Sequence, residues 1–515
     1  MGTFIGIIDL GSNTARLVVY YKDEQGSFYE FDNIKRVLRL SNHLQPNGLI
    51  SETGFQETMD CMRQFKELCD ARQVSEVIGV ATAAVRQASN GQELLAAIHR
   101  NTGIPFRLLT GEEEAYYGYL AVVNSMNVSD GISVDLGGGS TEVTLIRDRK
   151  LQESHSFPFG IVTLTKRFLQ REIPTDQEIV HLKQFLQQQF SSRPWLFNQK
   201  FPLIAMGGTA RNLGKIHQQQ IHYPMASLHH YLLDDQSVDR IFQWIRKLSL
   251  EQRKEVNGLS KDRADVIIAG IAVFQTLMEW IGTKQLIVSN KGLRDGVLYE
   301  KVLPLQNISC TDDIIRISTE QFMNRYQVPK GHAQHVKNLA CTLFDELKDL
   351  QILNLGANER KLLEIAALLH DVGRSINVYE ASQHTFYLLS NVLLLGLTHK
   401  QRILIAMTAS YKNNKQLQQQ QSRYAGIVDK SDKEMVEKLG HLVLLARILD
   451  RSMSQQIRSI RLLEKKKNIV IECTSIKENL LEYALLEDIL KRVSKVFTRS
   501  FSFVVKTPTA TFTNS

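Results

Sequence analysis

Residues 131–146 read GISVDLGGGSTEVTLI, and three consecutive glycines there separate two runs of strand-forming residues. Glycine weakens a strand because it has no side chain to pack and loses much conformational freedom on folding. The glycines therefore predict a tight turn between two strands, with Asp135 before the turn and Glu142 after it. Backbone N–H groups in such a turn suit phosphate oxygens, and carboxylates suit a divalent cation, although ordinary hairpin turns are also glycine-rich.

The same pattern occurs 126 residues earlier in the chain. DLGSNTARLVV (9–19) aligns with DLGGGSTEVTL (135–145), which places Asp9 on Asp135 and Arg16 on Glu142. Two copies predict two similar half-domains whose turns face each other across a cleft. Two further small-residue turns follow strand-like runs, at GGTARN (207–212) and at Ser289 and Asn290. Together the four turns predict a phosphate-binding constellation.

The bulk properties indicate a folded protein of several domains. The chain has 515 residues, of which 43% are hydrophobic and 23% charged, and no apolar run reaches the roughly 18–20 residues of a membrane span. The start of the chain lacks the basic and apolar regions of a leader. The five cysteines are scattered, which favours reduced thiols: Cys61, Cys69, Cys310, Cys341 and Cys473. We therefore expect a cytoplasmic protein, either free or peripherally associated with a membrane.

The order of patterns predicts α/β structure for about 300 residues, then amphipathic helices, then a short strand-helix-strand segment. The polar stretch KNNKQLQQQQSRYAG (412–426) predicts an exposed loop. Of the net charge of +8, residues 451–515 carry +6. A concentrated positive surface attracts polyanions, although a run such as EKKK (464–467) is also typical of a solvated loop.

GEEEA (111–115) places three adjacent carboxylates at a boundary between a loop and a helix. Acidic residues are favoured in the first turn of a helix by its dipole, which is one explanation for the cluster. Hydrolysis of a phosphoanhydride offers another, because it needs a group that orients the attacking water.

Six motifs in order resemble the actin-like phosphotransferase superfamily and, within it, the exopolyphosphatase and guanosine pentaphosphate phosphatase family. They are DLGSNTARL (9–17), VATAAVRQASN (80–90), LLTGEEEAYYGY (108–119), DLGGGSTE (135–142), GGTARN (207–212) and GLRDGVL (292–298). The resemblance, greatest to bacterial exopolyphosphatases, implies an α/β fold with two actin-like (ribonuclease H-like) domains, residues 1–125 and 126–305. It also implies an all-α HD-like domain, 306–454, and a small basic α/β domain, 455–515.

The resemblance also implies roles for individual residues. Glu114 becomes the general base, with Glu113 as the fallback. Asp135 and Glu142 become ligands of Mg²⁺ or Mn²⁺, with Asp9 as a further candidate, and a monovalent cation such as K⁺ is an additional expected cofactor. The implied phosphate-binding residues are Ser12, Asn13, Arg86, Gly137, Gly138, Gly139, Ser140, Gly207, Gly208 and Thr209.

A second constellation lies in the helical region. ALLHDVGRSI (367–376) contains adjacent His370 and Asp371, with His332 upstream and Asp450 downstream. This resembles the HD superfamily, in which such residues bind a metal for phosphohydrolysis, and imidazole and carboxylate are suitable ligands. Related proteins also keep such a domain as a scaffold.

We expect an exopolyphosphatase that uses Mg²⁺ and water to remove terminal orthophosphate from linear inorganic polyphosphate. The alternatives are a guanosine pentaphosphate 5'-phosphatase using the same site, and an HD-type phosphohydrolase whose actin-like half is regulatory. The acidic motif GEEEA (111–115) disfavours a further possibility, an actin-like kinase or nucleotide-binding scaffold. The expected partners are polyphosphate, guanosine pentaphosphate and a second copy in a homodimer, with no specific nucleic acid and no membrane span.

Overall fold

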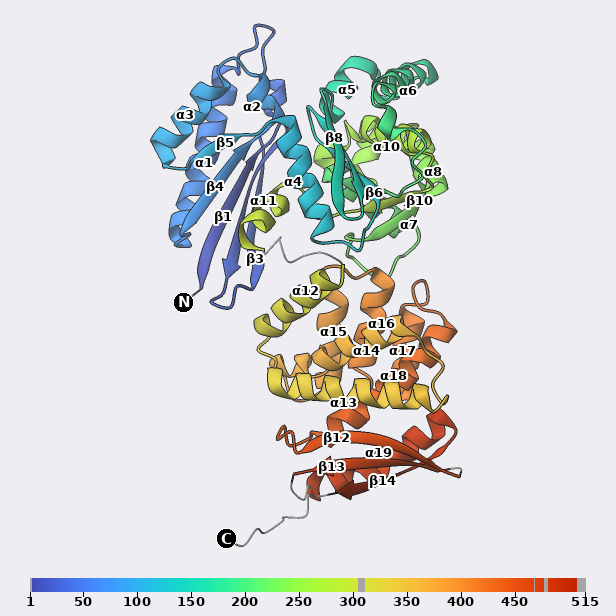
Figure 1. Ribbon diagram of the computed structural model, residues 1–515. Helices are drawn as coiled ribbons and strands as arrows, with labels where there is room; N and C mark the ends of the chain where they lie inside the picture. The colour runs from blue at the N-terminus through green and yellow to red at the C-terminus, as the bar shows by residue number, and fades with distance from the viewer. Residues whose placement is uncertain (1, 304–310, 467, 477–479, 507–515) are drawn as a thin grey trace. The chain divides into compact units, whose positions relative to one another are not determined.

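The computed structural model describes residues 2–303, 311–466, 468–476 and 480–506. The chain divides into two compact units, Met1–Ile317 and Ser318–Ser515, and Figure 1 shows the elements of each. Cys310, Lys467 and the predicted boundary at 305/306 lie outside the described residues. The other four cysteines are buried free thiols. No helix among the described residues is long and apolar enough to span a membrane.

The first sheet of unit 1 has the strand order β3-β2-β1-β4-β5. Apolar residues in its strands point alternately to the two faces of the sheet. Ile8 and Leu17 pack under α1 and α3, whereas Ile7 and Val18 pack under α4 and α11. The elements are β1 Thr3–Leu10, β2 Thr14–Lys22, β3 Phe28–Val37, η1 Leu40–Asn42, α1 Glu52–Ala71, β4 Glu76–Ala81, α2 Ala83–Gln87, α3 Gly91–Thr102, β5 Phe106–Leu108 and α4 Gly111–Val123.

The second sheet has the order β10-β11-β9-β6-β7-β8, and its larger core lies against α5, α6, α7, α8 and α10. The elements are β6 Gly131–Leu136, β7 Thr141–Arg147, β8 Lys150–Phe157, α5 Ile161–Phe168, α6 Asp176–Ser191, η2 Pro194–Leu196, β9 Leu203–Met206, α7 Gly207–Gln220, β10 Tyr231–Asp234, α8 Asp235–Ile245, α9 Leu250–Lys254, η3 Lys261–Arg263, α10 Ile267–Ile281, β11 Gln285–Val288 and α11 Leu293–Val302.

The two sheets share a topology. In each, a three-stranded antiparallel meander (β1-β2-β3 or β6-β7-β8) is extended beside its first strand by two parallel strands, β4 and β5 or β9 and β11. The second sheet has one more strand, β10, which pairs antiparallel with β11. The register also repeats, because Asp9 faces Arg16 and Asp135 faces Glu142 across their hairpins. The 126-residue repeat in the sequence therefore corresponds to a repeat in structure.

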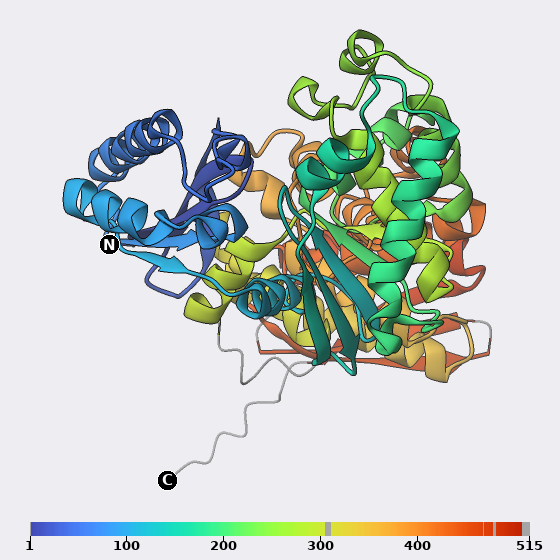
Figure 2. The ribbon, with the colours of Figure 1, turned by 90° about the horizontal axis from the view of Figure 1, so that it is seen from above.

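Helix α4 contacts both sheets. Tyr117 and Leu120 pack with the first sheet and α11, while Val122 and Val123 pack against Ile204 of the second sheet. Figure 2 shows α4 between the two halves. Helix α11 crosses α4 so closely that a Cβ on Gly296 would lie 2.0 Å from the Tyr117 carbonyl oxygen. Glycine at this position permits the crossing that fixes α4.

Unit 2 is a helical layer followed by the three-stranded sheet β12-β13-β14 and α19. Helices α13, α14 and α18 share one core with β12, β13 and α19. Helix α12, Thr311–Arg325, contains the division between the two units at 317/318. The other elements are α13 Lys330–Asp349, α14 Ala357–Leu369, η5 Val372–Ser375, α15 Ala381–Asn391, α16 His399–Ala409, α17 Asn414–Arg423, α18 Lys430–Leu449, β12 Ile457–Lys465, β13 Asn468–Ser475, α19 Leu480–Phe497 and β14 Ser500–Lys506.

The loop predicted at 412–426 is wrong, because α17 occupies most of it. The Asn413 side chain caps this helix by accepting a hydrogen bond of 2.9 Å from the Gln416 N–H. Leu417 and Gln420 are buried. Glutamine is a good helix former, and one apolar anchor with a good cap is enough to hold a polar helix against the unit.

We predict that Gly296→Ala lowers the free energy of unfolding of unit 1 by roughly 1–3 kcal/mol, because the added methyl group forces α11 away from α4. Gly426→Ala is the control, since a Cβ at Gly426 meets nothing within 4 Å. Urea unfolding of the full chain measures both. Equal stability of the two variants would show that the crossing tolerates a side chain.

Candidate functional site

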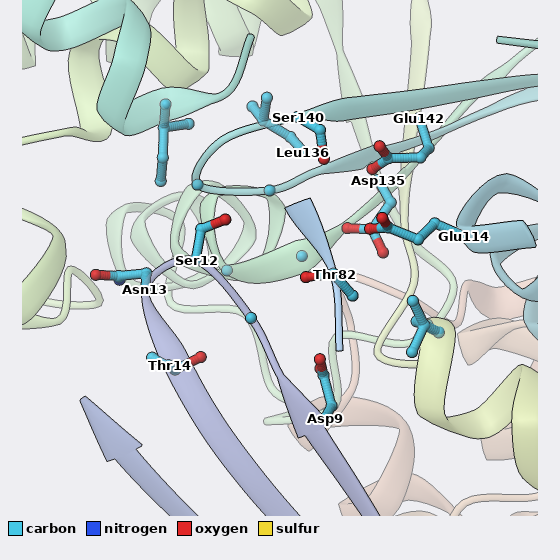
Figure 3. A pocket seen from close by; sticks show the side chains of 18 of the residues that line it. Asp9, Ser12, Asn13, Thr14, Thr82, Glu114, Asp135, Leu136, Ser140 and Glu142 are labelled. Carbon is cyan, nitrogen blue, oxygen red and sulfur yellow. The ribbon is translucent and has the colours of Figure 1, made fainter. Parts of the chain in front are cut away.

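The four turns predicted from the sequence line one pocket in unit 1 (Figure 3). Its floor and walls come from the ends of β1, β6, β9 and β11 and from the first turns of α7 and α11. The lining residues are Asp9, Gly11, Ser12, Asn13, Thr14, Thr82, Glu114, Asp135, Leu136, Gly137, Gly138, Ser140, Glu142, Ile161, Gly207, Gly208, Arg211, Arg263, Asn290, Gly292, Leu293 and Arg294.

The two repeated turns touch each other. A Cβ on Gly138 would lie 3.2 Å from Ser12 Cβ, so a side chain there would push the turns apart. The Gly137 and Gly138 carbonyls accept hydrogen bonds of 3.0 Å from the first N–H groups of α5. Among the described residues, the N–H groups of Gly138 and Gly139 have no protein acceptor. This arrangement suits the oxygens of a bound phosphate.

Three carboxylates from the two halves point toward one another in Figure 3: Glu114, Asp135 and Glu142. Burial, followed by repulsion from Asp135, raises the pKa of Glu142 to about 7. Burial and then Glu142 raise the pKa of Glu114 to about 9. Burial also raises the pKa of Asp9 and of Asp135, with opposing effects from Arg294 and Arg211.

A cation would offset the repulsion among these buried carboxylates, and oxygen ligands suit Mg²⁺. Glu114, Asp135 and Glu142 do not gather three ligand atoms within 4.8 Å of one another, as the histidine-aspartate cluster of unit 2 does. Mg²⁺ commonly takes only one or two carboxylates and completes its shell with water and substrate phosphate. The carboxylates present therefore fit Mg²⁺ bound in that manner.

Arg86 does not line the pocket in this structure. Its guanidinium group forms an ion pair with the Glu114 carboxylate and donates to the Leu109 carbonyl at 2.5 Å. This contact lowers the pKa of Glu114 and opposes the effect of burial. Arg86 therefore holds Glu114 here, and its expected contact with phosphate stays a prediction.

Two other predicted phosphate-binding residues also lie off the lining. Gly139 packs on Ser12, and a Cβ there would lie 3.1 Å from Ser12 Oγ. Thr209 is buried against α10, where its Cγ2 would be 2.5 Å from a Cβ on Gly270. Thr209 thus contributes to helix packing, whereas its neighbours Gly207 and Gly208 face the pocket.

The neighbouring residues Glu113 and Glu114 have different surroundings. Glu113 accepts a hydrogen bond of 2.8 Å from the Thr110 N–H, and Thr110 Oγ1 accepts one of 3.1 Å from the Glu113 N–H. This reciprocal pair is a capping box that begins α4. Glu114, only 6% exposed, turns into the pocket instead. The geometry separates the capping role from the candidate catalytic role.

A group of arginines that the sequence did not predict as site residues lies beside the carboxylates. A second pocket shares Thr14, Gly208, Arg211, Arg263 and Arg294 with the first. Its remaining lining residues are Arg16, Lys35, Asn212, Lys215, Gly258, Leu259 and Ser260. We call this second pocket the basic pocket.

Several cations of the basic pocket are held by neighbours. Arg294 pairs with Asp9 at 2.7 Å, and Lys35 pairs with Asp262 at 2.5 Å. Burial and then Arg294 lower the pKa of Arg211 to about 10. Arg211 and Arg294 lie in quoted motifs, GGTARN and GLRDGVL, so their positions after the turns were a usable signal. Arg263 lies in no motif and reaches Gly208 only through the fold.

The residues of the second predicted site lie close together in unit 2. Ligand atoms of His332, His370 and Asp371 all lie within 4.8 Å of one another. Asp450 Oδ2 lies 2.7 Å from His332 Nδ1, on the opposite side of that ring from Asp371. Arg447 and Arg374 contact the Asp371 carboxylate at 2.9 and 3.1 Å. Burial lowers the pKa of His370 to about 4.

Two similar α/β halves that meet at paired glycine-containing turns and a carboxylate cluster define a protein of the actin-like class. Residues 18–305 match the Ppx/GppA phosphatase family, and residues 314–492 match domain III of the Ppx/GppA phosphatases. The chain belongs to the Ppx/GppA phosphatase family, whose members hydrolyse phosphoanhydride bonds. The resemblance of the sequence to the exopolyphosphatase and guanosine pentaphosphate phosphatase family is thereby confirmed at the level of the family.

Individual relatives agree with this membership. An Aeromonas hydrophila protein named guanosine-5'-triphosphate,3'-diphosphate pyrophosphatase is 27% identical over 407 residues, which are 78% of each chain. The structure of an Aquifex aeolicus Ppx/GppA family member is 30% identical with a TM-score of 0.53, over 60% of this chain and 99% of that one. A Cytophaga hutchinsonii exopolyphosphatase structure, 24% identical, matches in fold with a TM-score of 0.54 over 58% and 98% of the chains.

We predict that Glu113→Ala lowers the free energy of unfolding by about 0.5–1 kcal/mol, because α4 loses half of its capping box. Turnover should stay close to that of the unchanged protein. Chemical denaturation and phosphate release from tripolyphosphate measure the two effects. Unchanged stability with lost turnover would instead make Glu113 the catalytic carboxylate.

Proposed function

We propose that this protein is an exopolyphosphatase that releases terminal orthophosphate from linear inorganic polyphosphate. The observation that carries the proposal is the basic pocket. Six of its twelve lining residues are lysine or arginine, and no carboxylate or aromatic side chain lines it. It shares five lining residues with the carboxylate pocket. A chain of phosphates needs cations along its length, and the basic pocket has no aromatic ring on which a nucleobase could stack.

In this proposal the terminal phosphate lies between the turn at Ser12 and Asn13 and the turn at Gly137–Ser140. Asp135 and Glu142, with Asp9 as a further candidate, hold Mg²⁺ or Mn²⁺. When bound, the cation offsets charge on the reacting phosphate. Arg211 and Arg263 lie where the next phosphates of the chain would extend into the basic pocket.

Glu114 accepts a proton from the attacking water, whose oxygen forms a bond to the terminal phosphorus. The bond between that phosphorus and the bridging oxygen breaks, and the shortened polyphosphate leaves with the electron pair. The pKa of about 9 describes Glu114 without a cation, and a cation held by Asp135 and Glu142 would lower it, because a positive charge favours the ionised carboxylate. Arg86 supports the same role, because its guanidinium group orients the Glu114 carboxylate and also favours its ionised form. The expected K⁺ and homodimer are not needed for these steps and stay predictions.

The second candidate is a guanosine pentaphosphate 5'-phosphatase that uses the same carboxylates. It is favoured by the Aeromonas hydrophila relative, whose name states that substrate class and which matches 78% of the chain. The basic pocket would then take the 3'-diphosphate of the nucleotide. The two candidates differ in how many phosphates lie beyond the reacting bond, and this difference is measurable.

We predict that Glu114→Gln reduces phosphate release from long polyphosphate by roughly 10²- to 10⁴-fold, because the attacking water loses its base. His370→Ala should retain most of the activity, since that side chain belongs to unit 2. Malachite-green detection of released phosphate measures both, and circular dichroism confirms folding. Loss of activity in His370→Ala alone would assign hydrolysis to the HD-like cluster instead.

We predict a higher kcat/KM for long polyphosphate than for guanosine pentaphosphate. Lys215→Glu should raise KM for long polyphosphate roughly tenfold and change it little for tripolyphosphate, because Lys215 lines the basic pocket but not the carboxylate pocket. Lys247→Glu, an equal charge change at an exposed residue outside both pockets, is the control. A preference for the nucleotide would select the second candidate.

A further inference from the structure

Ser156 lies directly opposite Glu142 on the neighbouring strand of the second sheet. Strands β7 and β8 pair antiparallel in a register that places the two residues side by side. The Ser156 hydroxyl donates a hydrogen bond of 2.8 Å to Glu142 Oε1. Glu142 is 5% exposed and lines the carboxylate pocket, whereas Ser156 does not line it. The hydroxyl therefore holds the carboxylate from outside the pocket lining.

The row of residues across each meander carries different charges in the two halves. In the first sheet the row runs from Asp9 through Arg16 to Lys35, and in the second from Asp135 through Glu142 to Ser156. Ser156 thus occupies the position that a lysine occupies in the first half. A lysine beside Glu142 would supply positive charge and compete with a bound cation, whereas a hydroxyl is a neutral donor. Serine fixes the direction of Glu142 and leaves its charge available to a cation.

Ser156 also lies against the start of α4. A Cβ on Gly111, the first residue of that helix, would be 2.4 Å from Ser156 Cβ and 2.6 Å from its hydroxyl oxygen. Glu114 follows in the same first turn. Ser156 therefore has two contacts that can be separated, because its Cβ lies next to Gly111 and its hydroxyl holds Glu142. Alanine at this position keeps the first contact and removes the second.

The direction of the Glu142 carboxylate matters for cation binding. Mg²⁺ requires near-octahedral geometry, and a long side chain that is already held loses less conformational freedom when it binds. An ionised carboxylate offers about four acceptor positions, so one hydrogen bond leaves it able to bind a cation. Hydrogen-bond partners of metal ligands commonly supply such orientation.

We propose that Ser156 is a positioning residue for Glu142, and that its hydroxyl holds the carboxylate in the direction in which it binds the cation of the carboxylate pocket. The proposal rests on the proposed function, because it needs a divalent cation at Asp135 and Glu142. Ser156 itself touches neither the cation nor the substrate. Its effect is therefore on cation affinity, and not on the hydrolytic step once the cation is bound.

Mn²⁺ binding to the full chain without substrate tests the proposal, with free Mn²⁺ measured by electron paramagnetic resonance. Ser156→Ala should weaken binding at the carboxylate pocket about 10- to 100-fold, as is typical when the partner of a metal ligand is removed. Glu142→Gln identifies that site, because the binding that remains in this variant belongs elsewhere in the chain. Ser154→Ala is the matched control and should bind as the unchanged chain does, since Ser154 lies on the same face of β8 but opposite Thr144.

Phosphate release from tripolyphosphate gives a second measurement. In Ser156→Ala the Mg²⁺ concentration for half-maximal rate should rise by a similar factor, while kcat at saturating Mg²⁺ stays within about twofold of the unchanged value. A role in folding alone would lower the free energy of unfolding in urea without changing the Mg²⁺ requirement.

Two results would overturn the positioning role and leave the proposed function intact. One is Ser156→Ala with the Mn²⁺ affinity and Mg²⁺ requirement of the unchanged chain, while Glu142→Gln loses binding. The other is an equal loss of Mn²⁺ affinity in Ser154→Ala, because the effect would then belong to β8 as a whole. If Glu142→Gln instead keeps all Mn²⁺ binding, cation binding by Glu142 fails, and the positioning role fails with it.

Discussion

The contact between two glycine-containing turns is the constraint on which unit 1 depends. Gly138 lies so close to Ser12 that a Cβ would be 3.2 Å from Ser12 Cβ, and the carbonyls of Gly137 and Gly138 accept hydrogen bonds from α5. The turn at Gly137–Ser140 is therefore held from behind by a helix and from the front by its counterpart. Because both turns end strands of different sheets, this one contact brings the carboxylates of both halves to a single pocket.

The repeat keeps its backbone register but changes its charge. Asp9 faces Arg16 in the first hairpin, whereas Asp135 faces Glu142 in the second. One copy thus places opposite charges side by side, and the other places two acids together, where burial raises the pKa of both. The two halves therefore present different charges to the same pocket, an acid beside a base from the first copy and two acids from the second.

The turns, the carboxylates and the α/β-to-helix order could be predicted because local patterns encode them. Glycine runs mark turns, and the repeat aligns Asp9 with Asp135. Arg263 could not be predicted, because its approach to Gly208 arises from the tertiary packing of a loop without a pattern. The pairing of Arg86 with Glu114 and the outward hydrogen bonds of Asp450 likewise depend on side-chain directions. The polar composition of α17 favours an exposed loop, but glutamine is also a good helix former, and the burial of Leu417 depends on the tertiary structure.

The position of Glu114 depends on how helix α4 packs against the two sheets. Tyr117 and Leu120 of this helix pack with the first sheet and α11, but its first turn also lies against β8 of the second sheet, where a Cβ on Gly111 would be 2.4 Å from Ser156 Cβ. Its last turn packs against the second sheet as well. Glu114 lies near the first end, while Asp135 and Glu142 belong to the second sheet. Because α4 touches the second sheet near both of its ends, Glu114 would move together with Asp135 and Glu142 if the two sheets rotated against each other. Such a rotation would instead change the distance from these three carboxylates to Asp9 and Ser12 of the first sheet.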